Sequence, residues 1–439
     1  MSNEANKGKA RVVGSAEVTL LGDKKVELPI VEGTQGELGL DVRTLRAQTG
    51  YVTFDPGFRN TASCESDISF VDGEKGVLRY RGIPIENVVK GTTFSEVALL
   101  LLTGVAPSSR GLQRFSDRLT KHSLLHEGMR HHFEGFPPDA QPMAILSAMI
   151  NSVSCYHPEL LLIGDEEHLM DAAAKLLAKV RTIAAFSYKK NRGEPIVYPD
   201  PQRSYVSNLL HMMFSLPYAD YEPSPALLDA LELFFILHAD HEQNCSTSTA
   251  RMVGSSGANL FASVAAAVCA LWGRLHGGAN AAVVQMLERI VERGESVANV
   301  VARAKDRTSD ERLWGFGHRV YKTHDPRATL LQAASKKVFE QMGSKDPLLE
   351  VALELEQTVR ADDYFIERKL YPNVDFYSGI ILRAVGIPLN MFTVMFAIGR
   401  MPGWIANWAE GWRHGDDLHR PRQIYTGPTK RSFTPLRER

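Results

Sequence analysis

The chain has 439 residues, of which 44% are hydrophobic and 23% charged, the balance of an ordinary globular protein. Its 50 Lys and Arg residues nearly cancel 51 Asp and Glu residues, which leaves a net charge of −1. This balance argues against a strongly basic surface for nucleic acid, and no apolar run approaches the roughly 18–20 residues of a membrane helix. We therefore expect neither nucleic acid nor a membrane among its partners.

The first residues and the cysteines indicate a cytoplasmic location. The stretch 1–11 is polar and contains Glu4, so it lacks the apolar core of a secretory signal and the acid-poor character of a transit peptide. The four cysteines form no Cys-x-x-Cys pair, which argues against a zinc ribbon and against a dithiol redox site.

The first 83 residues differ in pattern from the rest of the chain. Residues 16–20 and 25–30 alternate like two strands around a short turn, and 68–71 with 77–80 repeat the pattern around Asp-Gly-Glu-Lys-Gly. We expect a small β-rich N-terminal segment over 1–83, built from short hairpins.

From Pro84 onward the hydrophobic period is helical, which predicts a mainly α protein. Thr93 and Glu96 form a capping box, and Gly104 follows where a helix end favours a left-handed residue. Ser-Pro at 224–225 and Asp-Pro at 346–347 are typical of helix starts. Further helical patterns cover 108–125, 142–155, 166–190, 203–214, 227–238, 258–273, 280–293, 296–306, 328–342, 347–370, 376–385 and 389–399.

Two glycine-rich breaks interrupt the helical part, at 275–280 and 314–322. Each places a histidine beside glycine, where backbone can approach a ligand closely. His276 would lie just before a helix that starts near residue 279, and the partial positive charge there favours a neutral imidazole that donates a hydrogen bond. An equally simple interpretation is a loop histidine that caps the helix.

The second break suits an anionic ligand because His318 is surrounded by basic side chains such as Lys322. Gly315 and Gly317 are only a fragment of a dinucleotide fingerprint, and no strand precedes them. A solvated basic loop is the alternative.

Asp375 resembles the N-cap of a helix, although a carboxylate there could also act as a base. His238 and His241, three residues apart on a predicted helical face, could bind a metal, but core or substrate-facing histidines are the simpler interpretation.

Three arginines that are distant in sequence are further candidates for substrate binding. Arg327, Arg400 and Arg420 could together bind a dicarboxylate, because guanidinium matches carboxylate bidentately. The sequence alone leaves their convergence open.

At these residues the sequence resembles the citrate synthases, specifically the longer bacterial, type II members. The resemblance extends from about residue 16 to residue 431. Its strongest blocks are HADHEQNCSTSTAR at 238–251, GSSGAN at 254–259, LHGGAN at 275–280, GFGHRVYK at 315–322 and YPNVD at 371–375.

This resemblance implies a catalytic trio of His276, His318 and Asp375. Asp375 would remove a methyl proton from acetyl-CoA while His276 hydrogen-bonds the thioester oxygen, and His318 would polarise the ketone of oxaloacetate. The resemblance also implies oxaloacetate binding by His241, Arg327, Arg400 and Arg420, the last reaching across from a second subunit, and CoA contacts at Gly315, Gly317 and Lys322. No metal and no redox cofactor is implied.

The resemblance further implies a two-domain helical fold. The small domain would span 277–386, and the large domain would combine 84–276 with 387–439. A homodimer is the implied minimum active unit, a hexamer built as a trimer of dimers is expected, and NADH inhibition is a hypothesis for such longer members.

Three alternatives stay open on the sequence. One is 2-methylcitrate synthase, which uses propionyl-CoA with the same trio. A second is a metal-dependent hydrolase that uses the His238/His241 cluster. The third is a helical scaffold that binds CoA without turnover.

Overall fold

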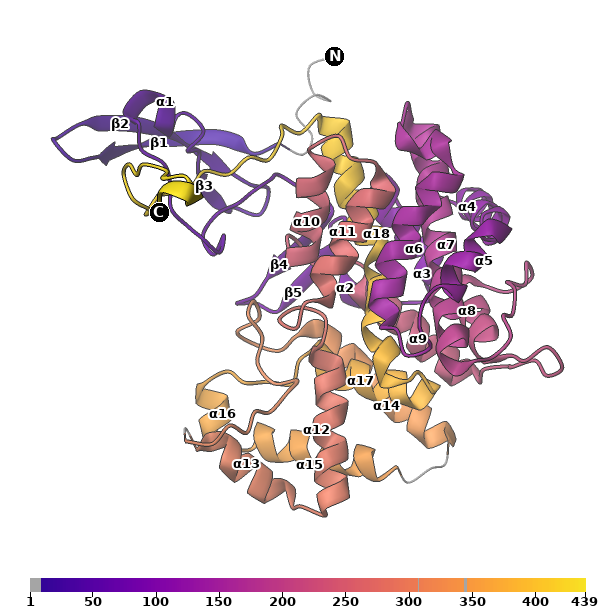
Figure 1. Ribbon diagram of the computed structural model, residues 1–439. Helices are drawn as coiled ribbons and strands as arrows, with labels where there is room; N and C mark the ends of the chain where they lie inside the picture. The colour runs from indigo at the N-terminus through magenta and orange to yellow at the C-terminus, as the bar shows by residue number, and fades with distance from the viewer. Residues whose placement is uncertain (1–8, 307, 343–345) are drawn as a thin grey trace. The chain divides into compact units, whose positions relative to one another are not determined.

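A computed structural model describes residues 9–306, 308–342 and 346–439 (Figure 1). Most of the N-terminal stretch that is expected to lack a targeting signal lies outside the described residues. The chain forms two compact units, one from 67 to 417 and the other from the described part of 1–66 together with 418–439. None of the helices in the described ranges combines the length and the hydropathy needed to span a lipid bilayer.

The smaller unit contains an antiparallel sheet of β1 (Arg11–Thr19), β2 (Lys25–Glu32) and β3 (Leu38–Leu40), joined in that order. Alternate residues of β2 are buried, which fits the period of two in the sequence. The hairpin predicted for 16–30 is confirmed, with β1 starting earlier than expected. The unit also holds α1 (Leu45–Thr49) and the 3-10 turn η4 (Leu436–Glu438).

The second predicted hairpin is also confirmed and lies in the larger unit. β4 (Ser69–Asp72), β5 (Val77–Tyr80) and β6 (Ile83–Pro84) form a small antiparallel sheet. Ser69 pairs with Tyr80 and Asp72 with Val77, so the turn between the strands lies at the far end from Ser69.

The larger unit is otherwise helical, as the sequence predicts. Its helices are α2 (Ile85–Val88), α3 (Phe94–Thr103), α4 (Ser109–Lys121), α5 (Arg130–Glu134), α6 (Pro142–Tyr156), α7 (Glu166–Arg192), α8 (Tyr205–Phe214), α9 (Pro225–His238), α10 (Cys245–Gly254), α11 (Leu260–Trp272), α12 (Ala279–Arg293), α13 (Val297–Lys305), α14 (Pro326–Met342), α15 (Pro347–Arg360), α16 (Asp363–Glu367), α17 (Val374–Val385) and α18 (Phe392–His414), with 3-10 turns η1 (Glu127–Met129), η2 (Pro158–Leu161) and η3 (Leu389–Met391).

The capping signals predicted from sequence are confirmed at three helix starts. The side chains of Thr93, Ser224 and Asp346 accept backbone N–H groups of the first turns of α3, α9 and α15. Gly104 ends α3 at a φ of 78°, in the left-handed region where glycine has no steric penalty.

Three helical predictions differ from the structure. The pattern at 347–370 is divided into α15 and α16, because Asp362 starts a new helix by accepting the N–H of Tyr364 at 3.0 Å. The short helices α1, α2, α5 and α10 have no counterpart among the predicted helices. The final helix continues beyond 399 through Pro402, and Gly403 N–H donates to the carbonyl of Ala239 at 3.0 Å instead of within the helix.

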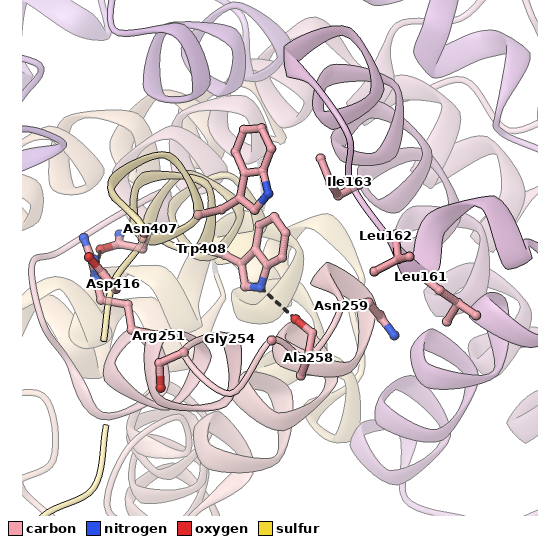
Figure 2. A pocket seen from close by; sticks show the side chains of 15 residues that line it. Leu161, Leu162, Ile163, Arg251, Gly254, Ala258, Asn259, Asn407, Trp408 and Asp416 are labelled. Carbon is pink, nitrogen blue, oxygen red and sulfur yellow. Dashed lines mark hydrogen bonds and ion pairs between the residues drawn. The ribbon is translucent and has the colours of Figure 1, made fainter. Parts of the chain in front are cut away.

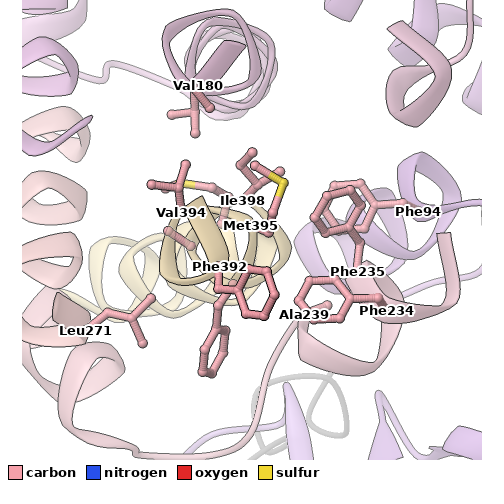
Figure 3. Packing of buried hydrophobic residues seen from close by; sticks show 14 of the residues in the cluster. Phe94, Val180, Phe234, Phe235, Ala239, Leu271, Phe392, Val394, Met395 and Ile398 are labelled. Atoms are coloured by element: carbon pink, nitrogen blue, oxygen red, sulfur yellow. The ribbon is translucent and has the colours of Figure 1, made fainter. Parts of the chain in front are cut away.

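The core of the larger unit is built around α18, which packs on α3, α7, α9, α10 and α11. Figure 3 shows Phe392, Val394, Met395 and Ile398 of this helix among aromatic and aliphatic side chains of its neighbours. A helix that is apolar on every side must lie inside a protein. This burial places the end of α9 and the middle of α18 side by side.

Helices α12, α13, α15 and α17 pack on one another. They gather at one end of the larger unit in Figure 1. All four fall within 277–386, the range expected for a small domain, whose boundaries stay a prediction.

Candidate active site

His276 lies in the loop between α11 and α12, two residues before Gly278, the N-cap of α12. The backbone N–H of Ser246 donates to its Nε2 at 3.3 Å, and the Ser246 hydroxyl lies 2.9 Å from the same nitrogen. A backbone N–H can only donate, so Nε2 accepts and the ring proton resides on Nδ1. Burial, with the charge of Arg400, lowers the pKa of His276 to about 4, and the ring is neutral at pH 7.

His318 lies in the glycine-rich loop that precedes α14. The backbone N–H groups of Val320 and Tyr321 donate to its Nδ1 at 3.1 and 3.2 Å. Nδ1 is therefore an acceptor, and Nε2 carries the proton. Burial and the charge of Arg327 lower the pKa of His318 to about 4, so this ring is also a neutral donor.

Asp375 lies in the first turn of α17, where the predicted N-cap role is wrong. The capping residue is Asn373, whose side chain accepts the N–H of Asp375 at 2.9 Å. Because the amide of Asn373 caps the helix, the carboxylate of Asp375 is not used for capping. Burial raises the pKa of Asp375 to about 6, although the charge of Arg327 acts in the opposite direction.

The expected helical pair of His238 and His241 is also wrong, because α9 ends at His238 and His241 lies in the loop beyond it. His238 is fully buried, and its Nδ1 bonds the carbonyl of Phe234 at 2.7 Å. His241 has its Nε2 3.1 Å from the hydroxyl of Tyr321, and burial lowers its pKa well below the usual value. Two histidines on a common helical face, as the metal hypothesis requires, are therefore not present.

Arg327 is buried at the start of α14 and is held by Asp325. Its Nε and Nη2 donate to the two carboxylate oxygens of Asp325 at 3.0 and 2.9 Å. Against the effect of burial, Arg327 lowers the pKa of Asp325 and keeps it ionised. The same carboxylate accepts the N–H of Val374 at 3.2 Å, and so fixes Arg327 relative to the start of α17.

Arg400 is buried in the middle of α18. Its Nε donates to the carbonyl of His238, and its guanidinium lies over the ring of Phe396. Burial lowers the pKa of Arg400 to about 10, so it stays charged at pH 7.

These side chains form one cluster around two guanidinium groups. The rings of His241 and His318 are 5.7 Å apart. The charge of Arg327 acts on both of these rings, and the charges of Arg327 and Arg400 both act on Asp375. Two buried cations beside neutral donors suit a small dianion with a carbonyl group.

The remaining predicted residues are Arg420 and the three expected CoA contacts, Gly315, Gly317 and Lys322. Arg420 is exposed and belongs to the smaller unit. Gly315 has a φ of 84°, and a Cβ there would lie 2.9 Å from the Cβ of Phe376; a Cβ at Gly317 would lie 2.7 Å from Leu370. Lys322 is exposed, with its ammonium 3.1 Å from the carbonyl of Arg319.

Sequence reasoning missed Ser246, Tyr321 and Asp325, which contact the cluster residues directly. Asp325 had a readable signal, because Asp-Pro at 325–326 repeats the helix-start pattern used at 346–347. Ser246 and Tyr321 carry no comparable local signal, since their contacts come from distant segments.

A separate cavity of about 260 Å³ opens beside the end of α18 (Figure 2). Apolar side chains of Leu161, Leu162 and Trp408 form one side, while Arg251 and Asp416 form an ion pair on the other. None of the cluster residues lines it. Within the described residues, no group of three or more His, Cys, Asp or Glu side chains is arranged to hold a metal ion.

Comparison with known proteins finds relatives along most of the chain. Residues 57–422 match the family model "Citrate synthase, C-terminal domain". Citrate synthase 1 of Mycobacterium tuberculosis is 49% identical over 413 residues, which cover 94% of this chain and 96% of the relative.

Solved structures give the same result. Citrate synthase from Pyrobaculum aerophilum superposes with a TM-score of 0.81 at 36% identity, covering 89% of this chain and 98% of that one. The ternary complex of citrate synthase from Thermoplasma acidophilum with carboxymethyl coenzyme A and oxaloacetate gives 0.80 at 28% identity, covering 88% and 100%.

The fold and the matches define an enzyme of the acyltransferase class. The chain belongs to the citrate synthase family, whose members form citrate.

Proposed function

We propose that this chain condenses acetyl-CoA with oxaloacetate and hydrolyses the resulting citryl-CoA to citrate and CoA. One observation carries the proposal: two neutral imidazoles, His276 and His318, and one buried carboxylate, Asp375, each lie in the field of the buried guanidinium group of Arg327 or Arg400. A thioester α-proton is weakly acidic, so a base must act together with a group that stabilises the developing oxyanion.

Asp375 is the proposed base that takes the methyl proton of acetyl-CoA. The Nδ1–H of His276 donates to the thioester oxygen as negative charge develops there. A neutral imidazole suits this role, and contact of Nε2 with Ser246 supports the required tautomer. The raised pKa of Asp375 makes it a stronger base that is still mostly ionised above pH 7.

His318 is the proposed electrophilic partner on oxaloacetate. Its Nε2–H donates to the ketone oxygen and gives that oxygen its proton as the deprotonated methyl carbon of acetyl-CoA attacks the ketone carbon. Water then cleaves the thioester of citryl-CoA and releases CoA as a thiol. This sequence of steps needs no metal and no redox cofactor.

The two carboxylates of oxaloacetate are proposed to bind Arg327 and Arg400, with His241 beside them. Each arginine uses part of its guanidinium on the protein and keeps further N–H groups for a substrate. We assign Arg420 to the site of a second subunit, which makes a homodimer the minimum active unit and a trimer of dimers the expected assembly.

The remaining assignments follow the family resemblance. Gly315, Gly317 and Lys322 are proposed to contact CoA, and 277–386 is proposed to close as a small domain over bound oxaloacetate. We place the enzyme in the cytoplasm and propose inhibition by NADH. Unchanged activity during an NADH titration would reject that inhibition.

The test is release of CoA thiol with oxaloacetate, with acetyl-CoA and propionyl-CoA compared at equal concentrations. A strong preference for acetyl-CoA is expected. Preference for propionyl-CoA would move the chain to the 2-methylcitrate synthases, and no release from folded protein would contradict the proposal.

Asp375→Asn tests the base. We expect turnover to fall by roughly 10²–10⁴-fold while oxaloacetate binding stays, because the shape is kept and the proton acceptor is lost. Asp363→Asn is a matched control, since Asp363 also lies in a first helical turn but is exposed. Near-normal turnover of Asp375→Asn would remove Asp375 from the base role.

A further inference from the structure

The β4–β5 hairpin contacts the turn that carries His241. The hydroxyl of Ser69 donates to the carboxylate of Asp240 and accepts the N–H of Glu242 at 3.0 Å. Glu242 Oε1 in turn accepts the N–H of Val71 at 2.9 Å. Glu242 has a φ of 50°, which is uncommon for a residue other than glycine, and these bonds to the strand hold it there.

The second strand of the hairpin contacts the same turn. Asp240 N–H donates to the hydroxyl of Tyr80 at 3.2 Å, and this hydroxyl lies 3.1 Å from the carbonyl of Ile236. Tyr80 and Asp240 are fully buried. The base of the hairpin and the His241 turn therefore share one buried set of hydrogen bonds.

The tip of the hairpin contacts the loop that carries His318. Lys322 N–H donates to the carbonyl of Gly73 at 2.8 Å. A Cβ at Gly73 would lie 2.2 Å from the carbonyl oxygen of Val320, and one at Gly76 would lie 2.7 Å from that of His324. Only glycine lets the two backbones approach this closely.

The segment that the tip contacts also orients both substrate-facing histidines. Val320 and Tyr321 supply the two N–H groups that fix Nδ1 of His318. The hydroxyl of Tyr321 lies 3.1 Å from Nε2 of His241. A shift of residues 320–322 would therefore move both rings.

We propose that the β4–β5 hairpin is a positioning element for oxaloacetate: Ser69 sets the His241 turn, and Gly73 sets the His318 loop at a fixed distance from it. The inference rests on the proposed function, because it assigns oxaloacetate contacts to these two histidines. Neither Ser69 nor Gly73 touches the substrate; each acts through a histidine loop.

Gly73→Ala tests the tip of the hairpin. Its Cβ would push on Val320, and a displacement near 1 Å at a reacting group can cost up to about 10²-fold in rate. We expect kcat/KM for oxaloacetate to fall at least about tenfold. Gly164→Ala is the matched control, because a Cβ there meets nothing within 4 Å.

Ser69 provides a variant without a steric clash. Ser69→Ala removes the hydroxyl and should raise KM for oxaloacetate by about three- to tenfold. Ser69→Thr keeps the hydroxyl, so its KM for oxaloacetate should be close to that of the wild type. If Gly73→Ala fails to fold, this pair still decides the question.

A double-mutant cycle separates positioning from general damage. If Gly73 acts through His318, Gly73→Ala should have a smaller effect on oxaloacetate binding by calorimetry when His318→Gln is already present, and the part that remains is the part passed through Tyr321 to His241. Full additivity would overturn the assignment to His318. In Ser69→Ala, equal loss for both substrates together with a lower denaturation midpoint would instead indicate a merely structural hairpin.

The two proposals fail in different ways. Wild-type protein without thiol release would refute the proposed function. The hairpin proposal alone would be refuted by a different result in an active wild type. In that result Gly73→Ala has the same kinetics with oxaloacetate as Gly164→Ala, and Ser69→Ala has the same kinetics as the wild type.

Discussion

Replacing Asp325 with asparagine is a sharp test of how the oxaloacetate site is held together. The Asp325 carboxylate accepts three bonds from Arg327, at 3.0, 3.0 and 2.9 Å, and one from Val374 N–H at 3.2 Å. Both side chains of the ion pair are buried, with 1% and 4% of their surface exposed. Asp325→Asn keeps the shape but turns an NH₂ group toward these donors and leaves the guanidinium without a counter-charge.

Removal of one partner of a buried ion pair typically costs about 3–5 kcal/mol. Asparagine keeps one acceptor oxygen, so we expect the free energy of unfolding to fall by about 3 kcal/mol. KM for oxaloacetate should rise at least about tenfold, because Arg327 can turn away from the site. Glu288→Gln is the control: its pair with Arg383 at 2.6 Å is partly exposed, and such pairs contribute about 1 kcal/mol or less.

The assay is denaturant unfolding at a fixed protein concentration, with thiol release to measure KM. Because Arg327 holds the pKa of Asp325 below its usual value, this stabilisation is fully present above the unfolded pKa of about 3.9. It is lost as pH falls through the lower folded-state pKa, so the difference in stability between the two proteins should begin to shrink below about pH 4. A loss no larger than that of Glu288→Gln, with unchanged KM, would refute the reasoning.

Three further predictions concern titration and assembly. Burial raises the pKa of Glu232 to about 7, so its contribution to stability is full below the unfolded pKa of about 4.3 and is lost as pH rises through about 7. In the wild type the free energy of unfolding should therefore change by about 1–3 kcal/mol more between pH 5 and 8 than in Glu232→Gln, as measured by denaturant unfolding. The same pH dependence in both proteins would contradict this. The kcat/KM for acetyl-CoA should rise with pH to a plateau above about pH 6, where Asp375 is ionised, whereas a flat profile would argue against this carboxylate as base. Mixing Arg420→Ala with Asp375→Asn should restore one intact site per mixed dimer, and no recovery of thiol release after verified subunit exchange would argue against a shared site.

Local signals predicted the elements well where one side chain decides a boundary. Thr93, Ser224 and Asp346 each cap a helix within three residues, so their effect is visible in a short window. The hairpin at 69–80 was predictable for the same reason, because its turn and alternation are local.

The helix starts and ends that were predicted wrongly depend on contacts with distant residues or on two neighbouring residues that could both cap the helix. At 373–375 the sequence offers Asn and Asp two residues apart, and nothing local shows that Asn373 is the cap. Continuation of α18 through Pro402 depends on Ala239, whose carbonyl accepts the displaced N–H from 164 positions away. For the site, the residue types were predictable from the family resemblance, whereas the bonds of Ser246 to His276 and of Asp325 to Val374 join segments that only folding brings together.

The proline in α18 also ties this helix to a distant part of the chain. Pro402 interrupts the helical hydrogen bonds, and the N–H of Gly403 is satisfied by a residue that precedes it by more than a third of the chain. A Cβ at Gly403 would lie 2.3 Å from that same carbonyl. An isolated 392–414 peptide should therefore fray at its centre. The segment that carries Arg400 and the turn that carries His241 are thus joined by a contact between distant parts of the chain, so neither reaches its final geometry without the other.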